Sequence, residues 1–129
     1  MPLVEREHWA EVMSRRLERR GERSRPSDER LLSRAQRLNQ RYFAGTLCWT
    51  SIGFAEMERL WGSCTFTDGA IRIARRAAAL PEWVLDYMLM HELAHLVHSD
   101  HGPEFHAVVN RYRLTERAKG YLLAIDSMA

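Results

Sequence analysis

The sequence predicts an α+β domain in which a small, mainly antiparallel three-stranded sheet packs on a central helix, with additional helices around it. The chain has 129 residues, about the length of one domain. Three short segments between residues 49 and 74 are rich in β-forming residues. Residues 83–97 are apolar on all sides of a helical axis, which is typical of a buried helix. We therefore expect a single domain over residues 1–129.

Two amphipathic helices are expected before the sheet. Within residues 3–20, apolar residues recur at helical spacing; they are Trp9, Val12, Met13 and Leu17. A polar linker over residues 21–26 follows. Ser27 can then cap a second helix, because Asp28 and Glu29 lie where the positive end of the helix dipole favours anions. The buried stripe of this helix is expected to comprise Leu31, Ala35, Leu38 and Tyr42.

The three strands are expected over residues 49–55, 61–67 and 70–74. Asp68 and Gly69 separate the second strand from the third. This pair favours a two-residue hairpin turn, because both positions of that turn need a positive φ. The pattern therefore predicts an antiparallel hairpin as the main part of the sheet.

The central helix is expected over residues 81–99, since a proline at its start suits a first helical turn. Gly102 and Pro103 interrupt the chain after it. A further helix is expected over residues 104–112, with Phe105 on its inward face, and Thr115 can cap a last one. The all-round apolar character of the first of these helices predicts that it lies in the middle of the domain.

Composition excludes several classes of protein. With 46% hydrophobic and 28% charged residues, the chain has enough apolar surface to fold, unlike a disordered or low-complexity segment. Its two cysteines, Cys48 and Cys64, are too few for a zinc ribbon, an iron–sulfur cluster or a disulfide framework. No apolar run approaches the roughly 20 residues that span a bilayer, and Glu5, Glu7 and His8 stand where a signal peptide is apolar. We therefore expect no membrane partner and a cytoplasmic location.

Residues 91–95 (HELAH) place two histidines and a glutamate inside the expected central helix. Four residues advance an α-helix by about 400°, so His91 and His95 lie about 40° apart around the axis and about 6 Å along it. Two imidazoles at this spacing can bind one metal ion. Glu92 lies about 100° from His91, off the metal but within reach of a coordinated water molecule, where a general base is needed.

A catalytic zinc site usually has three protein ligands and one open position. His101 is the expected third ligand, because it follows His95 in a polar, glycine-containing segment that lets the chain turn back. His98 is the alternative ligand. It returns to the face of His91 but lies about 10 Å farther along the axis, so we expect it beside the site. His106 is expected to be an exposed position on the next helix.

Residues 87–105 (YMLMHELAHLVHSDHGPEF) resemble the active-site segment of the SprT-like and YgjP-like zinc metallopeptidases, in which HELxH precedes a histidine that opens an H-G/S-x-x-F stretch. Residues 61–64 (WGSC) and 70–73 (AIRI) resemble two neighbouring strands of the YgjP-like group, and residues 38–43 (LNQRYF) resemble the SprT-like entry segment. The resemblance implies a zincin-like metallopeptidase domain with its catalytic core over residues 27–129.

The resemblance also implies the chemistry. Zn²⁺ would be held by the matching positions His91, His95 and His101, with Glu92 as general base, and the substrate would be a peptide or protein. Zinc lowers the pKa of its bound water towards neutrality, and the glutamate takes the proton and later gives it to the leaving amine. The chain departs from the YgjP-like pattern at Leu60, where that group commonly has arginine.

Other residues bear on a peptide substrate. The strand over residues 61–67 could pair its edge with an extended peptide. Arg111, Tyr112 and Arg113 are candidates, by position only, for stabilising the developing oxyanion. Cys64 is expected to be a small buried hydrophobic residue.

Two alternative functions remain open. The same water activation could hydrolyse a nucleotide phosphoanhydride or a non-peptide amide. A DNA-associated role, as in SprT-like relatives, would use the arginine-rich residues 15–25, within a segment (1–41) of net charge +4; residues 42–129 carry −2. Glu18 and Glu22 interrupt that run, and the net charge of the chain is only +2. These charges favour a solvated helix face over a nucleic-acid interface.

Overall fold

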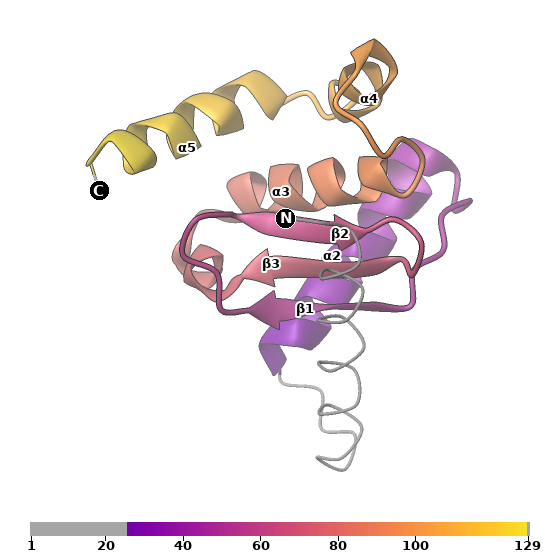
Figure 1. Ribbon diagram of the computed structural model, residues 1–129, viewed down its shortest axis with the longest axis horizontal. Coiled ribbons are helices and arrows are strands. Elements are labelled where there is room, and N and C mark those ends of the chain that lie inside the picture. The colour runs from indigo at the N-terminus through magenta and orange to yellow at the C-terminus, as the bar shows by residue number, and fades with distance from the viewer. Residues whose placement is uncertain (1–25, 129) are drawn as a thin grey trace.

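The computed structural model describes residues 26–128. In chain order the elements are α2 (Pro26–Phe43), β1 (Ser51–Ala55), β2 (Gly62–Thr65), β3 (Ala70–Ala74), the short 3₁₀ helix η1 (Arg75–Ala79), α3 (Glu82–His95), α4 (Pro103–Val109) and α5 (Thr115–Met128). α3 lies between the sheet and the α4–α5 pair and also packs against α2 (Figure 1). The α+β fold with a central α3 is therefore confirmed. The helix expected over residues 3–20 and the arginine-rich residues 15–25 lie outside the described residues.

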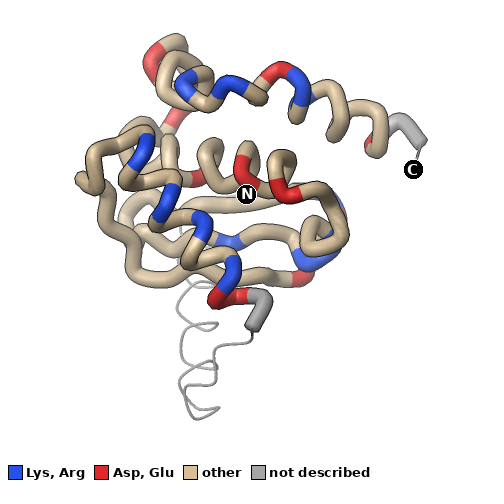
Figure 2. The backbone as a smooth tube through the Cα atoms, turned by 180° about the vertical axis from the view of Figure 1, so that it is seen from behind, with Lys and Arg blue, Asp and Glu red and all other residues tan. Residues whose placement is uncertain are grey.

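α2 forms where its apolar stripe and its acidic first turn predict a helix. Leu31, Ala35 and Leu38 are buried against the core as expected, whereas Tyr42 is only half-buried and Phe43 is buried beside it. Arginine positions recur along this helix (Figure 2). The hydrophobic face holds α2 on the sheet and on α3.

The sheet is mixed, with strand order β1-β3-β2. β3 pairs antiparallel with β2 and parallel with β1, so the expectation of a mainly antiparallel sheet holds for only one of the two pairs. All five residues of β3 are buried. The most buried strand, β3, takes the central position of the sheet. β1 therefore pairs with β3 through a crossover connection and not with β2, which follows it in the sequence. β2 is left as an edge strand among the described residues.

The hairpin between β2 and β3 has a four-residue loop, residues 66–69, and the expected two-residue turn at Asp68 and Gly69 is wrong. Thr65 pairs with Ala70, so the second strand ends two residues earlier than expected. Gly69 has a φ of 67° and its amide donates to the Thr65 carbonyl at 2.7 Å. The Gly69 carbonyl accepts from the Thr50 amide at 3.0 Å. This bond to the segment before β1 favours the longer loop.

α3 ends at His95, four residues before the expected end. The amides of Leu96 and Val97 donate to carbonyls three residues back, at 3.0 Å each, which tightens the last turn. The chain then leaves the helical path, so His98 is not on α3. This early end matters for the site, because it returns the following segment towards the histidines of α3.

α4 and α5 follow close to their expected positions. Thr115 begins α5, but its hydroxyl donates to the carbonyls of Val109 and Tyr112, at 3.0 and 2.8 Å, instead of accepting a helical amide as a cap would. Its side chain therefore joins α5 to the end of α4. None of the helices in residues 26–128 has the length and apolar composition needed to cross a membrane.

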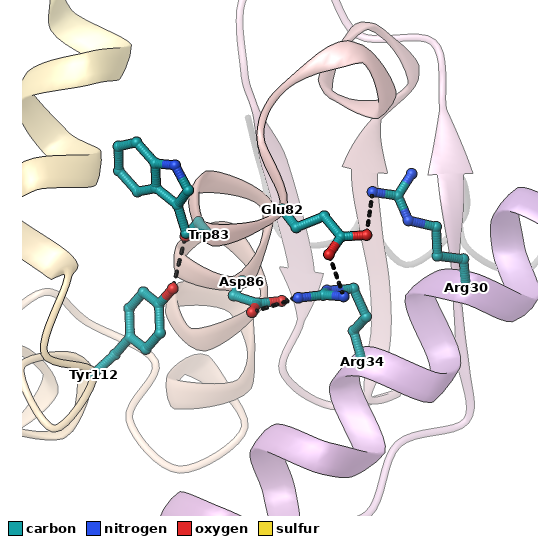
Figure 3. A network of polar contacts seen from close by, with 6 residues as sticks. All are labelled: Arg30, Arg34, Glu82, Trp83, Asp86 and Tyr112. Atoms are coloured by element: carbon teal, nitrogen blue, oxygen red, sulfur yellow. Dashed lines mark hydrogen bonds and ion pairs between the residues drawn. The ribbon is translucent and has the colours of Figure 1, made fainter.

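A polar network fixes the N-terminal half of α3 (Figure 3). Arg34 of α2 binds both carboxylate oxygens of Asp86, at 2.6 and 2.8 Å, and contacts Glu82 at 3.1 Å. On the other side, the Tyr112 hydroxyl donates to the Trp83 carbonyl at 2.8 Å. α3 is thus held to α2 and to the segment after α4 at once.

Candidate metal centre

Three imidazoles converge at the C-terminal end of α3. His91 and His95 lie one turn apart on the helix, with ring centroids 5.1 Å apart, and His101 approaches from the loop between α3 and α4. One ring nitrogen of each lies within 4.8 Å of the others. The closest pair is His95 Nε2 and His101 Nε2, at 3.0 Å. The helical spacing and the early end of α3 together bring these rings to one point.

Local structure explains how His101 returns. After the tight turn at the end of α3, the Asp100 carboxylate accepts the Gly102 amide at 3.4 Å and shapes the last part of the loop. Gly102 is the residue before α4, and Pro103 opens that helix. His101 therefore stands between an ordered turn and a helix start, although its own side chain is exposed.

Phe105 of α4 packs against all three rings. It is 1% exposed and stacks on His95, with centroids 4.4 Å apart and an interplanar angle of 30°. Its centroid lies 4.9 Å from those of both His91 and His101, in edge-on contacts. The sequence placed Phe105 on an inward face but did not indicate this role; the signal was its place at the end of the H-G/S-x-x-F stretch.

The electrostatics favour a neutral ring at His91. Burial, followed by the neighbouring His95 and His101, lowers the pKa of His91 to about 3. His95 Nδ1 lies 3.1 Å from the His98 carbonyl, which can only accept, so Nδ1 carries the proton and Nε2, which lies 3.0 Å from His101 Nε2, carries the lone pair. Neutral rings with an oriented lone pair are the form in which histidine binds a metal.

Glu92 follows His91 on α3 but is not a member of the three-histidine cluster. Its side chain is 5% exposed. The carboxylate faces the start of β2, where Gly62 leaves room for it. It also contributes, after burial and Glu116, to the raised pKa of Tyr87.

The two other histidines within residues 26–128, His98 and His106, lie outside the cluster. His98 Nδ1 is 3.6 Å from Glu104 Oε2, and the backbone carbonyl of His98, rather than its ring, contacts His95. The expected position of His98 beside the site holds, but for another reason, since α3 has already ended. His106 is exposed on α4, as expected, with its ring edge-on to Phe105.

The three residues proposed by position as oxyanion donors are placed elsewhere. The Tyr112 hydroxyl bonds the Trp83 carbonyl near the start of α3, and Arg111 donates to the Tyr42 carbonyl at 3.0 Å. Arg113 is exposed in the segment before α5. These bonds of Tyr112 and Arg111 join the segment after α4 to α3 and to α2. Cys64 is buried, as its position on a strand predicted.

The donor set fits a divalent metal ion. Two nitrogens that bind one tetrahedral zinc at about 2.0–2.1 Å lie about 3.3 Å apart. The separations in the cluster, from 3.0 Å to at most 4.8 Å, bracket that value. Imidazole is a common ligand of zinc, and three of them leave one position open. Small rotations of the rings would therefore complete a site of the catalytic type.

Comparisons with known proteins found a family model and solved structures that are similar to this chain. The family model described as "YgjP-like, metallopeptidase domain" matches residues 5–118. The crystal structure of the abylysin metallopeptidase zymogen of Pyrococcus abyssi is 26% identical, with a TM-score of 0.60, over 78% of this chain and 92% of that chain. The jannalysin metallopeptidase zymogen of Methanocaldococcus jannaschii is 17% identical, with a TM-score of 0.61, over 77% and 97%, and shows likeness of fold. No curated protein matches the chain.

Proposed function

Because the chain belongs to the YgjP-like metallopeptidase family, we propose that it is a zinc-dependent peptidase. In this proposal His91, His95 and His101 hold the metal, and Glu92 is the general base. The observation that carries the proposal is the approach of one nitrogen from each histidine to within 4.8 Å of the others. The second observation in support of the proposal is the buried carboxylate of Glu92, one residue after His91.

The proposed roles divide between ligands and base. A zinc ion held by the three rings would supply Lewis acidity, which polarises a scissile carbonyl and makes water more acidic. Glu92 takes the proton from the attacking water and passes it to the leaving amine. His95 keeps the orientation needed for binding through its bond to the His98 carbonyl. Phe105 limits the rotation of the rings by packing on all three.

We propose that an extended peptide binds along β2. This strand pairs with β3 on one side and is an edge strand of the sheet in the described residues, the kind of strand to which a peptide can be added. β2 also lies next to α3, which carries two of the histidines and the carboxylate. A peptide added to this edge would be bound through main-chain hydrogen bonds, which a peptide of any sequence can form.

The experiment that tests the function compares wild type with Glu92→Gln, each loaded with one equivalent of zinc. Casein and mixed peptides test peptide hydrolysis; nucleoside triphosphates and a DNA duplex test the alternative roles. We expect hydrolysis of peptides by the wild type and a loss of about 10²- to 10⁴-fold in Glu92→Gln, the usual contribution of a general base. Metal content is expected to be unchanged. Full activity in Glu92→Gln, or turnover of nucleotides alone, would contradict the proposal.

A further inference from the structure

The Glu92 carboxylate lies against a position on β2 where no side chain fits. An ideal Cβ added to Gly62 would lie 2.8 Å from Glu92 Oε2 and 3.2 Å from the Arg72 carbonyl oxygen. A Cβ atom in ordinary van der Waals contact lies 3.4–4 Å from its neighbours. The catalytic helix and the edge strand therefore approach each other closely at this glycine.

The backbone at the start of β2 is anchored on several sides. The Trp61 carbonyl accepts the Ala74 amide of β3 at 2.8 Å. The guanidinium of Arg76 lies 3.6 Å from the centroid of the Trp61 ring, and the indole nitrogen donates to Asp126 of α5 at 3.4 Å. A side chain at Gly62 would therefore displace the neighbouring Glu92 carboxylate before it displaced the backbone of β2.

The neighbour that would move is the Glu92 carboxylate, at the end of a flexible side chain. Glu92 is 5% exposed, so the displaced group would have to find another buried position. The α3 backbone is held by the adjacent turns and by the core residues Leu89 and Leu93, both 0% exposed. The added methyl group would thus act on the direction of the carboxylate more than on the fold.

We propose that Gly62 is a positioning residue for Glu92: the missing side chain leaves the space in which the carboxylate is held against the start of β2. The role in catalysis rests on the proposed function of Glu92 as the base. The contact between the two residues does not, and it can be tested without any turnover.

The main variant is Gly62→Ala, and Gly53→Ala is its matched control. Gly53 lies on β1 and also faces a carboxylate, but a Cβ there would lie 3.4 Å from Asp28, an ordinary contact. With zinc bound, Gly62→Ala is expected to lower kcat by about 10- to 100-fold, the cost of misplacing a catalytic group by about 1 Å. KM is expected to stay within about twofold, because the added methyl group faces Glu92 while the proposed peptide pairs with the main chain of β2. Zinc affinity is expected to stay within the same limit, because the histidine ligands are unchanged. Gly53→Ala is expected to leave kcat, KM and zinc affinity as in the wild type.

A second measurement uses metal-free protein. Gly62→Ala is introduced into the wild type and into Glu92→Asp, whose carboxylate is one methylene shorter. The substitution is expected to lower the midpoint of thermal unfolding by a few degrees in the wild type and by clearly less in Glu92→Asp, because the shorter side chain relieves the contact. Effects of the alanine on the unfolded chain are equal in both backgrounds and cancel.

Equal shifts of the midpoint in both backgrounds, together with an unchanged kcat in Gly62→Ala, would overturn the proposal. A crystal structure of Gly62→Ala with the Glu92 carboxylate in its original place would do so too. If the zinc-loaded wild type hydrolyses no peptide, the proposed function fails, while the unfolding measurement still decides whether Gly62 sets the position of Glu92.

Discussion

The two ends of α3 use polar side chains in different ways. At the N-terminal end, the carboxylates of Glu82 and Asp86 are bound by arginines of α2, with Arg34 engaging both oxygens of Asp86 (Figure 3). At the C-terminal end, three imidazoles direct ring nitrogens towards one another, which gives no comparable ion pair. One helix thus carries carboxylates paired within the chain at one end and two of the three clustered imidazoles at the other.

The difference separates stability from function. Opposite charges at hydrogen-bonding distance stabilise the packing of α2 on α3 whether or not a ligand binds. Three lone pairs brought together stabilise the folded chain only when a metal binds them. Substitutions at the first end should therefore change the free energy of unfolding without changing metal affinity, and substitutions at the second should change metal affinity.

Phe105→Ala has the largest expected effect, because it should lower both the free energy of unfolding and the affinity for zinc. Removing this buried ring should lower the free energy of unfolding by about 3–5 kcal/mol. It should also weaken zinc binding by about 10- to 100-fold, because the ring packs on all three histidines and fixes their orientation. Urea unfolding of metal-free protein and competition with a chelator measure the two effects.

The matched control is Phe54→Ala, since Phe54 is 4% exposed in the core and lies on β1. It should lose similar stability and keep its zinc affinity. If both variants lose zinc affinity equally, general loosening of the fold, and not ring contact, accounts for the result.

Asp86→Ala should change only the N-terminal end of α3, by removing the ion pair with Arg34. It removes the two short bonds to Arg34 in a half-buried position, so we expect a loss of about 2 kcal/mol in the free energy of unfolding. Zinc affinity should remain within about twofold. Glu116→Ala, which removes an exposed contact to Lys119 at 3.4 Å, should cost less than about 0.5 kcal/mol. A large fall in zinc affinity in Asp86→Ala would show that the two ends of the helix are coupled.

Tyr112→Phe has a smaller effect and a specific pH dependence. Burial, followed by the charge of Asp86, raises the pKa of Tyr112 to about 12. The unfolded chain loses this proton from about pH 10, so the wild type should lose stability between about pH 10 and 12, where only the unfolded state ionises. The variant should lack this part of the decline and, at neutral pH, be less stable by about 1 kcal/mol through the lost bond to Trp83. Equal pH profiles for the two proteins would contradict the assignment.

Sequence patterns could predict much of this arrangement, because they depend on periodicity. Helical spacing is enough to place His91 and His95 on one side of α3, and the all-round apolar pattern is enough to place α3 in the middle of the fold. The return of His101 follows from the polar segment and the Gly102–Pro103 break. These features are local, so one sequence contains the information for them.

The remaining features depend on contacts between distant segments. The parallel pairing of β1 with β3 follows from which strand is buried deepest, and the longer loop after Thr65 follows from a bond to Thr50. Periodicity assigns Phe105 to an inward face but does not say which rings it will contact. The contact between Gly62 and Glu92 involves residues 30 positions apart in the sequence. No local sequence pattern predicts such a contact.

The most direct test of the metal centre is zinc analysis of three purified proteins: wild type, His101→Ala and His98→Ala. A chelator-competition titration gives the stoichiometry and affinity of each. We predict one zinc per chain in the wild type, an affinity lower by at least about 10²-fold in His101→Ala, which removes a direct ligand, and little change in His98→Ala, whose backbone carbonyl is retained. Loss of zinc in His98→Ala with retention in His101→Ala would contradict the proposed ligand set.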